Sequence, residues 1–119
     1  MRVAVLGGTG YIGRALMNAL VDVVGVEHVY SVARTWSSFM WTHPHVSFVS
    51  LDVARGELTL LDLLDTHKID TVIHAAGPPG EALCRADPKN ARGCHVYTAE
   101  VLAGWQRLDP ARRIIYLST

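Results

Sequence analysis

Cysteine, net charge and long apolar runs are all scarce in this chain of 119 residues. The two cysteines, Cys84 and Cys94, have neither the spacing of metal ligands nor the density of a disulfide framework. Eleven basic side chains balance eleven acidic ones, so charge does not favour nucleic acid or an anionic membrane as a partner. No apolar run approaches the roughly 20 residues of a membrane span, and glycines interrupt the short apolar N-terminus, which excludes a secretory signal. We therefore expect one domain, residues 1–119, in a reducing cytoplasmic setting.

Glycines, by contrast, are concentrated near the N-terminus. An apolar run over residues 3–6 is followed by Gly7, Gly10 and Gly13, and a helical pattern begins at once. The first glycine permits a sharp turn, the second lets the backbone approach a pyrophosphate, and the third lets the helix pack closely on the strand. The free amides of the helix N-terminus then face the anion. This arrangement predicts dinucleotide binding, and a glycine-rich turn without a ligand is the alternative.

Strand signals alternate with helix signals, which predicts a parallel sheet with helical crossovers. The predicted strands are residues 3–6, 28–33, 46–51, 71–76 and 113–118. Three helices are predicted. The first has an apolar face from Ile12 to Val23 and a C-cap at Gly25, and the second has Leu58, Leu61 and Leu64 on one face. The third begins near Asp87-Pro88, with Asp87 as its cap, and runs to about Trp105. Residues 77–80, Gly-Pro-Pro-Gly, predict a break that is neither helix nor strand.

The predicted strands read as apolar runs rather than as alternating patterns, which is typical of a sheet covered by helices on both faces. Right-handed crossovers favour the strand order 3-2-1-4-5, the order of a Rossmann-type doubly wound α/β domain. A ligand should then bind at the carboxyl ends of the strands, in the crevice between the first and fourth strands. Residues 7–13, Arg34, Asp52 and Gly77 all fall at this edge.

Arg34 directly follows the second predicted strand, where a residue that reads the cofactor belongs. No acid ends this strand to accept from the ribose 2′-hydroxyl of NAD. A guanidinium can hold the 2′-phosphate of NADP bidentately, so the sequence favours NADP over NAD. The alternative is that Arg34 is a solvated surface charge.

Five segments come in the order seen in extended short-chain dehydrogenases/reductases, the NAD-dependent epimerase/dehydratase group. They are residues 7–13 (GGTGYIG), 51–53 (LDV), 72–77 (VIHAAG), Asn90 with Gly93, and 115–119 (IYLST). The chain resembles this family over essentially its whole length. The resemblance implies an NAD(P)-dependent epimerase, dehydratase or reductase that acts on a nucleotide sugar or a similar small carbonyl or alcohol substrate. A non-catalytic dinucleotide-binding regulator or accessory subunit is the alternative.

The resemblance also implies roles for individual residues. Asp52 would accept from the adenine amino group beside the Val53 backbone, and residues 75–77 would pass along the ribose and nicotinamide side. Asn90 would support the active site. Together with the glycine pattern, the expected cofactor-binding residues are Gly7, Gly10, Tyr11, Ile12, Gly13, Arg34, Asp52, Val53, Ala75, Ala76, Gly77 and Asn90. Two alternatives stay open, that Asp52 caps the next turn and that Asn90 is an ordinary amide on a helix surface.

The family's catalytic groups are only partly present. Thr119, with Ser118 as the runner-up, matches the family's catalytic Ser/Thr, which hydrogen-bonds the substrate oxygen. The family also needs a Tyr-x-x-x-Lys pair, in which the tyrosine exchanges the proton and the lysine lowers its pKa. None of the four tyrosines has a lysine four residues on, so we expect this chain alone to be inactive.

We therefore expect the chain to be the N-terminal portion of a longer enzyme, with the substrate lobe absent and the fifth strand an exposed edge. The alternative is that another chain supplies the missing surface. The oligomeric state is open, although the resemblance implies that a second copy of the chain could pair through the helix that contains Asn90 to form a homodimer.

Four other features have simpler interpretations. The aromatic segment Trp36–His45 could stack on adenine or form an interaction surface, but a loop folded onto the side of the domain is favoured. His43 and His45 have no third ligand at metal-site spacing, so no metal is expected. His74 lies in an apolar strand and is expected to be a hydrogen-bonded core histidine. The cysteines have no activating base and are not expected to be nucleophiles.

Overall fold

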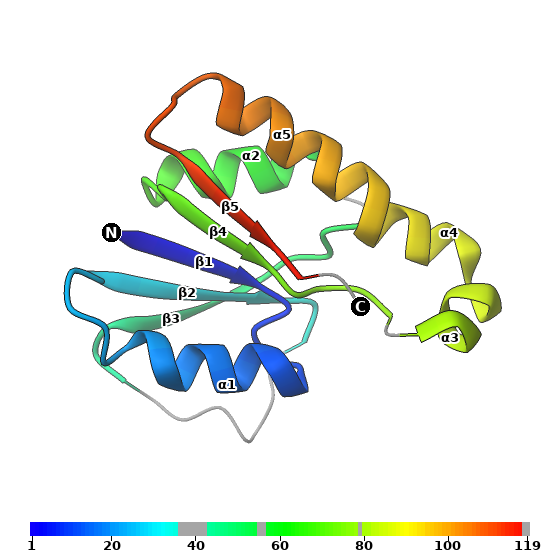
Figure 1. The fold of residues 1–119 in the computed structure, drawn as a ribbon, viewed down its shortest axis with the longest axis horizontal. Coiled ribbons are helices and arrows are strands. Elements are labelled where there is room, and N and C mark those ends of the chain that lie inside the picture. The colour runs from blue at the N-terminus through cyan, green and yellow to red at the C-terminus, as the bar shows by residue number, and fades with distance from the viewer. Residues whose placement is uncertain (36–42, 55–56, 79, 118–119) are drawn as a thin grey trace.

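The computed structural model describes residues 1–35, 43–54, 57–78 and 80–117 and contains a five-stranded sheet (Figure 1). The strands are β1 (Arg2–Leu6), β2 (His28–Ala33), β3 (Val46–Ser50), β4 (Thr71–His74) and β5 (Arg113–Tyr116). All neighbouring strands are parallel, in the order β3-β2-β1-β4-β5. This is the Rossmann-type order that the sequence predicts, with the reversal between β1 and β4.

Helices cover both faces of the sheet, with α1 on one side and α2 and α5 on the other (Figure 1). The helical segments are α1 (Tyr11–Leu20), α2 (Glu57–Thr66), α3 (Gly80–Ala86), α4 (Pro88–Arg92), the π-helical turn η1 (Gly93–Tyr97) and α5 (Thr98–Arg107). Alternate strand residues enter different cores, since Val3 and Val5 pack with Met17 of α1 whereas Ala4 and Leu6 pack with α2 and α5. None of the helices within the described ranges is long and apolar enough to cross a bilayer.

Several predicted boundaries are wrong by a few residues. The first helix ends at Leu20 and its C-cap is Val21, so Gly25, which has φ +93°, belongs to the following turn and not to the cap. Ala75 and Ala76 lie beyond the end of β4, because the chain leaves the sheet there toward Gly77, which has φ +124°. The third predicted strand also ends one residue early, at Ser50.

The helical region after β4 differs more from the prediction. The break expected over residues 77–80 is wrong at its end, because α3 begins at Gly80, and an ion pair between Glu81 and Arg85, one turn apart, supports this short helix. The cap of the next helix is confirmed, since Asp87 accepts from the backbone N–H of Asn90 at 3.1 Å. That helix is interrupted by η1, which the sequence analysis did not predict.

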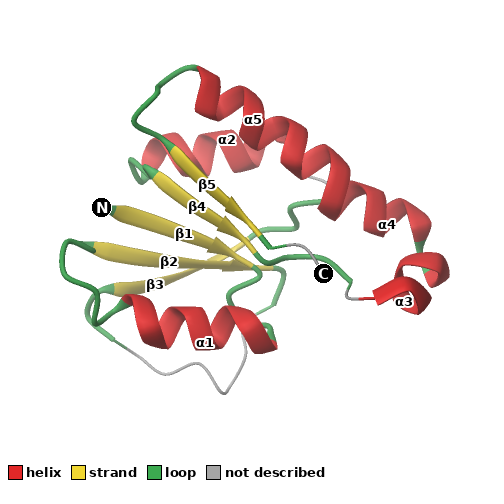
Figure 2. Ribbon diagram, in the orientation of Figure 1, coloured by secondary structure: helices red, strands yellow, loops and turns green. Residues whose placement is uncertain are grey.

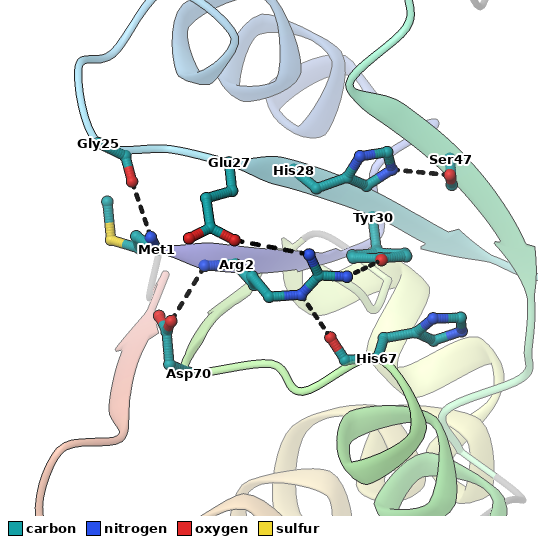
Figure 3. Close-up of polar contacts among 9 residues, drawn as sticks. All are labelled: Met1, Arg2, Gly25, Glu27, His28, Tyr30, Ser47, His67 and Asp70. Carbon is teal, nitrogen blue, oxygen red and sulfur yellow. Dashed lines mark hydrogen bonds and ion pairs between the residues drawn. The ribbon is translucent and has the colours of Figure 1, made fainter.

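A polar cluster holds the amino edge of the sheet together (Figure 3). The backbone N–H of Arg2 donates to Asp70 Oδ2 at 3.0 Å, and its Nε donates to the His67 carbonyl at 2.7 Å. Its guanidinium also donates to the Tyr30 hydroxyl, whose ring lies between those of His28 and His67 with centroids 4.7 and 4.5 Å away. These groups satisfy one another, so the hydrogen bonds at the amino ends of the strands hold the fold together.

The strand β5 forms an edge of the sheet, as the sequence predicts. Its Ile114 packs against the core on the side of α2 and α5, whereas Ile115 is 49% exposed. The exposure follows from strand geometry, because successive side chains point to opposite faces and α1 packs against β1 and β2 rather than β5.

Candidate functional site

A cavity of about 350 Å³ lies at the carboxyl ends of the strands, where the loops after β1, β2, β3 and β4 gather (Figure 2). It is lined by Gly7, Thr9, Gly10, Val32, Ala33, Arg34, Thr35, Leu51, Asp52, Val53, Ala75, Ala76, Gly77, Pro78, Asn90 and Cys94. Nine of the twelve residues expected to bind a cofactor are among them, and the exceptions are Tyr11, Ile12 and Gly13. The structure therefore brings together most of the predicted site, at the topological switch point of the sheet.

The glycine turn between β1 and α1 is built as the spacing predicts. Gly7 has φ +85°, and a Cβ on it would lie 2.8 Å from the carbonyl carbon of Ala75. A Cβ on Gly13 would lie 2.0 Å from the Gly7 carbonyl oxygen, so only glycine permits this close packing of α1. A Cβ on Gly10, by contrast, would meet only that same oxygen, at 3.4 Å. Gly10 is thus dispensable for packing, and its bare backbone faces the cavity.

The N-terminus of α1 completes this cradle. Among the described residues no side chain caps the helix, and no partner is found there for the amides of Tyr11, Ile12 and Gly13. The side chains of Tyr11 and Ile12 are 87% and 53% exposed, and neither residue is among those that line the cavity. Uncapped amides at a helix N-terminus suit a diphosphate.

Arg34 and Asp52 stand on the adjoining wall of the cavity. Arg34 is exposed, and its carbonyl accepts from the Ser50 hydroxyl at 3.0 Å, which fixes the backbone at the end of β2. Asp52 Oδ1 accepts from the backbone N–H of Ala54 at 3.0 Å. Asp52 therefore caps its turn, the alternative raised from the sequence, while also lining the cavity.

Asn90 and Cys94 approach the cavity from the helix that contains η1. Asn90 is half-buried, and the Cys94 thiol donates to its Oδ1 at 3.8 Å. Burial raises the pKa of Cys94, and the charge of Asp52 raises it further. Both effects favour the neutral thiol over the thiolate.

The sequence analysis left out seven residues that line the cavity. They are Thr9, Val32, Ala33, Thr35, Leu51, Pro78 and Cys94. Five of them directly adjoin a predicted site residue and Val32 lies two positions before Arg34, so the rule of binding at strand ends could have included these six. Cys94 reaches the cavity through the π-helical turn, for which the sequence carries no pattern.

His74 is a buried, hydrogen-bonded histidine, as predicted. It is 1% exposed, and its Nε2 lies 2.7 Å from the Cys94 carbonyl. A carbonyl only accepts, so Nε2 carries the proton, and Nδ1 accepts from the backbone N–H of Ala76 at 3.3 Å. Burial lowers the pKa of His74 and the nearby His95 lowers it further, against the opposing effect of the bond to Cys94.

We expect acid to destabilise the fold in part through His74. Its pKa is depressed in the folded chain, so as pH falls below about 6.5 the unfolded chain takes up a proton that the folded chain resists. The free energy of unfolding, measured by urea titration at pH 7.5 and 5.5, should decrease with acid, and less so in His74→Gln. Equal decreases in both proteins would assign the acid sensitivity to other groups, such as His28, whose pKa burial and Arg2 also lower.

Two predictions fall wholly or largely outside the described residues. Ser118 and Thr119, the expected catalytic residues, lie there, as do residues 36–42 of the aromatic segment. Within that segment, the described rings of His43 and His45 have centroids 5.6 Å apart. Over the described ranges, no three His, Cys, Asp or Glu side chains are grouped to hold a metal ion.

A doubly wound sheet with a glycine-lined cavity at its switch point defines the Rossmann class of nucleotide-binding domains. The family model described as "NAD dependent epimerase/dehydratase family" matches residues 3–119. The chain therefore belongs to the NAD-dependent epimerase/dehydratase family, whose members are NAD-dependent oxidoreductases and epimerases.

One curated relative is similar in sequence over part of the chain. It is a dTDP-6-deoxy-L-talose 4-dehydrogenase (NAD(P)(+)) from Kitasatospora kifunensis, 46% identical over 78 residues, which cover 64% of this chain and 23% of the relative. The aligned part is thus about a quarter of the relative's length.

Solved structures share the fold at lower identity. An L-threonine dehydrogenase from Clostridium difficile has a TM-score of 0.84 at 19% identity, over 99% of this chain and 36% of that one. A UDP-glucose 4-epimerase from Thermotoga maritima, solved with UDP-glucose, has a TM-score of 0.81 at 21% identity, over 100% and 38%. These likenesses support the fold, and the chain spans less than half the length of either protein.

Proposed function

We propose that residues 1–119 form the cofactor-binding part of an NAD(P)-dependent oxidoreductase or epimerase that acts on a nucleotide sugar. The observation that carries the proposal is the cavity itself, whose glycine turn is followed by uncapped amides at the N-terminus of α1. The curated relative acts on a dTDP-linked deoxy sugar by its name, which supports a nucleotide sugar as the substrate class.

In this proposal the cavity holds the two halves of the dinucleotide on different walls. The diphosphate lies against the amides of residues 11–13, and Gly10 allows its close approach. The adenine half lies toward Arg34 and Asp52, and the nicotinamide half toward residues 75–77. Asn90, which lies on α4, supports the active site.

The bound nicotinamide supplies hydride transfer to or from a substrate carbon. Thr119, or Ser118, would hydrogen-bond the substrate oxygen, and the proton would pass through the Tyr-x-x-x-Lys pair of the family. Because no tyrosine among the 119 residues has a lysine four positions on, we propose that the chain binds the dinucleotide without turning it over. A homodimer and a cytoplasmic location stay predictions.

Calorimetric titration of the chain with NADP, NAD and ADP tests the binding proposal directly. We expect both dinucleotides to bind, NADP more tightly, and ADP to bind more weakly because it lacks the nicotinamide half. Absence of heat with all three at millimolar concentration would overturn the proposal. Turnover of dTDP- and UDP-linked sugars is then assayed with any longer form of the protein. A regulator that only holds the dinucleotide would bind it there and show no turnover.

We expect Arg34→Asp to reverse the preference for NADP. The substitution removes the guanidinium and places a carboxylate where the 2′-phosphate would lie, so the ratio of NADP to NAD affinity should fall at least about tenfold. Arg107→Glu makes the same change in charge at an exposed position that does not line the cavity, and it should leave the ratio unchanged. Identical ratios in wild type and Arg34→Asp would exclude Arg34 as the selector.

A further inference from the structure

The π-helical turn η1 packs against the loop after β3, which lines one side of the cavity. Gly93 lies so close to the loop after β3 that a Cβ on it would be 2.8 Å from the Ala54 side chain. Immediately after the turn, the Thr98 hydroxyl lies 3.0 Å from the Val53 carbonyl and 2.9 Å from the Gly93 carbonyl. The turn is thereby joined to the loop that carries Asp52 and Val53.

The same turn reaches the opposite wall through His95. Its Nε2 lies 3.2 Å from the Pro78 carbonyl, and because a carbonyl only accepts, Nε2 carries the proton. Its Nδ1 is then free to accept from the Tyr116 hydroxyl, which lies 3.2 Å away on β5. The same hydroxyl also lies 3.3 Å from the His95 carbonyl, so its single proton can go to either of these two acceptors. His95 thus connects the loop after β4 to β5 with both ring nitrogens.

The His95 ring also lies against Gly77. A Cβ on Gly77 would be 2.6 Å from the ring carbon Cε1 and 2.8 Å from Nε2. Gly77 has φ +124°, a conformation that glycine alone adopts readily. Gly77 and Pro78 both line the cavity, whereas His95 does not. The ring therefore backs the cavity wall without entering the cavity.

We infer that His95 is a positioning residue that holds the Gly77–Pro78 wall in the shape that accepts the nicotinamide half of the dinucleotide. The inference rests on the proposed function, which places residues 75–77 on that side. A π turn widens the helix locally, and such turns often occur at functional sites. Here two residues of the widened turn contact different sides of the cavity. Gly93 packs against the loop after β3, and His95 packs against the loop after β4.

Three variants and two probes test this role. His95→Leu removes both ring nitrogens, His95→Gln keeps an amide donor for the Pro78 carbonyl, and Tyr116→Phe removes the hydroxyl on the other side of the ring. His45→Leu is the matched control, since His45 is exposed and lies before β3, outside the cavity lining. Each protein is titrated with NADP, as the whole dinucleotide, and with ADP, as a probe of the adenine and diphosphate half.

We expect His95→Leu to weaken NADP binding about tenfold, as loss of a positioning hydrogen bond does, and to leave ADP affinity within about twofold. His95→Gln should recover most of the NADP affinity, Tyr116→Phe should give a smaller loss, and the control should match wild type. Unchanged NADP affinity in His95→Leu, or equal losses for NADP and ADP, would overturn the inference while the proposed function stands. Failure of the wild-type chain to bind either probe would overturn the proposed function and this inference with it.

Discussion

Gly10→Val should abolish dinucleotide binding while leaving the fold intact. Gly10 has φ −74° and ψ 175°, an extended conformation that valine adopts without strain. A Cβ there would meet only the Gly7 carbonyl, at 3.4 Å, so the added methyl groups would project toward the space proposed for the diphosphate. We expect the dissociation constant for NADP, measured by calorimetry, to rise at least about 100-fold.

Circular dichroism and thermal unfolding provide the control for this variant. Its melting temperature should stay close to that of wild type, because no packed neighbour is displaced. Gly10→Ala should give an intermediate loss of affinity, since its single methyl group intrudes less. Wild-type affinity in Gly10→Val would show that no diphosphate approaches this backbone, and the proposed binding mode would fail.

Gly13→Ala should destabilise the fold strongly. The added Cβ would lie 2.0 Å from the Gly7 carbonyl oxygen and 2.8 Å from the Gly8 Cα, both backbone atoms that cannot rotate away. Helix α1 would have to shift off the glycine turn, which we expect to cost about 3 kcal/mol of unfolding free energy. Urea denaturation followed by circular dichroism measures this loss.

Gly104→Ala is the matched control, because Gly104 is also a glycine within a helix and a Cβ on it would meet nothing within 4 Å. Alanine has the higher helix propensity, so we expect this variant to gain roughly 0.5–1 kcal/mol. If Gly13→Ala lost no more stability than Gly104→Ala, the close approach of α1 to the turn would be contradicted.

Local patterns predicted the strands and their order well. The mainly apolar runs over residues 3–6 and 28–33 became β1 and β2, because a parallel strand covered on both faces favours apolar side chains, and the polar Ser31 within β2 is itself buried. The spacing of Gly7, Gly10 and Gly13 predicted the turn, since the steric demand for a missing Cβ acts over a few residues. Strand ends then placed Arg34 and Asp52 at one edge of the sheet, a consequence of parallel topology.

The helical region after β4 could not be predicted in the same way. The pair Gly77-Pro78 indicated a break, yet α3 begins at Gly80, and η1 interrupts an otherwise regular helical pattern. A single π turn leaves no recognisable pattern in the sequence. Here the turn is joined to residues distant in sequence, as in the contact between Thr98 and Val53. The same reason explains why Cys94 and His95 were not expected near the cavity.

The sequence by itself determined the layered α/β architecture, the glycine turn and the edge of the sheet where the cavity lies, since each follows from short-range sterics and the alternation of apolar segments. Only the tertiary structure decided which side chains enter the cavity and which back its walls. Asp52 proved to cap its own turn, the side chains of Tyr11 and Ile12 to be exposed outside the cavity lining, and His95 to join the loop after β4 to β5. These outcomes depend on where separate segments meet in space, and that information is spread over the whole chain rather than held in any one motif.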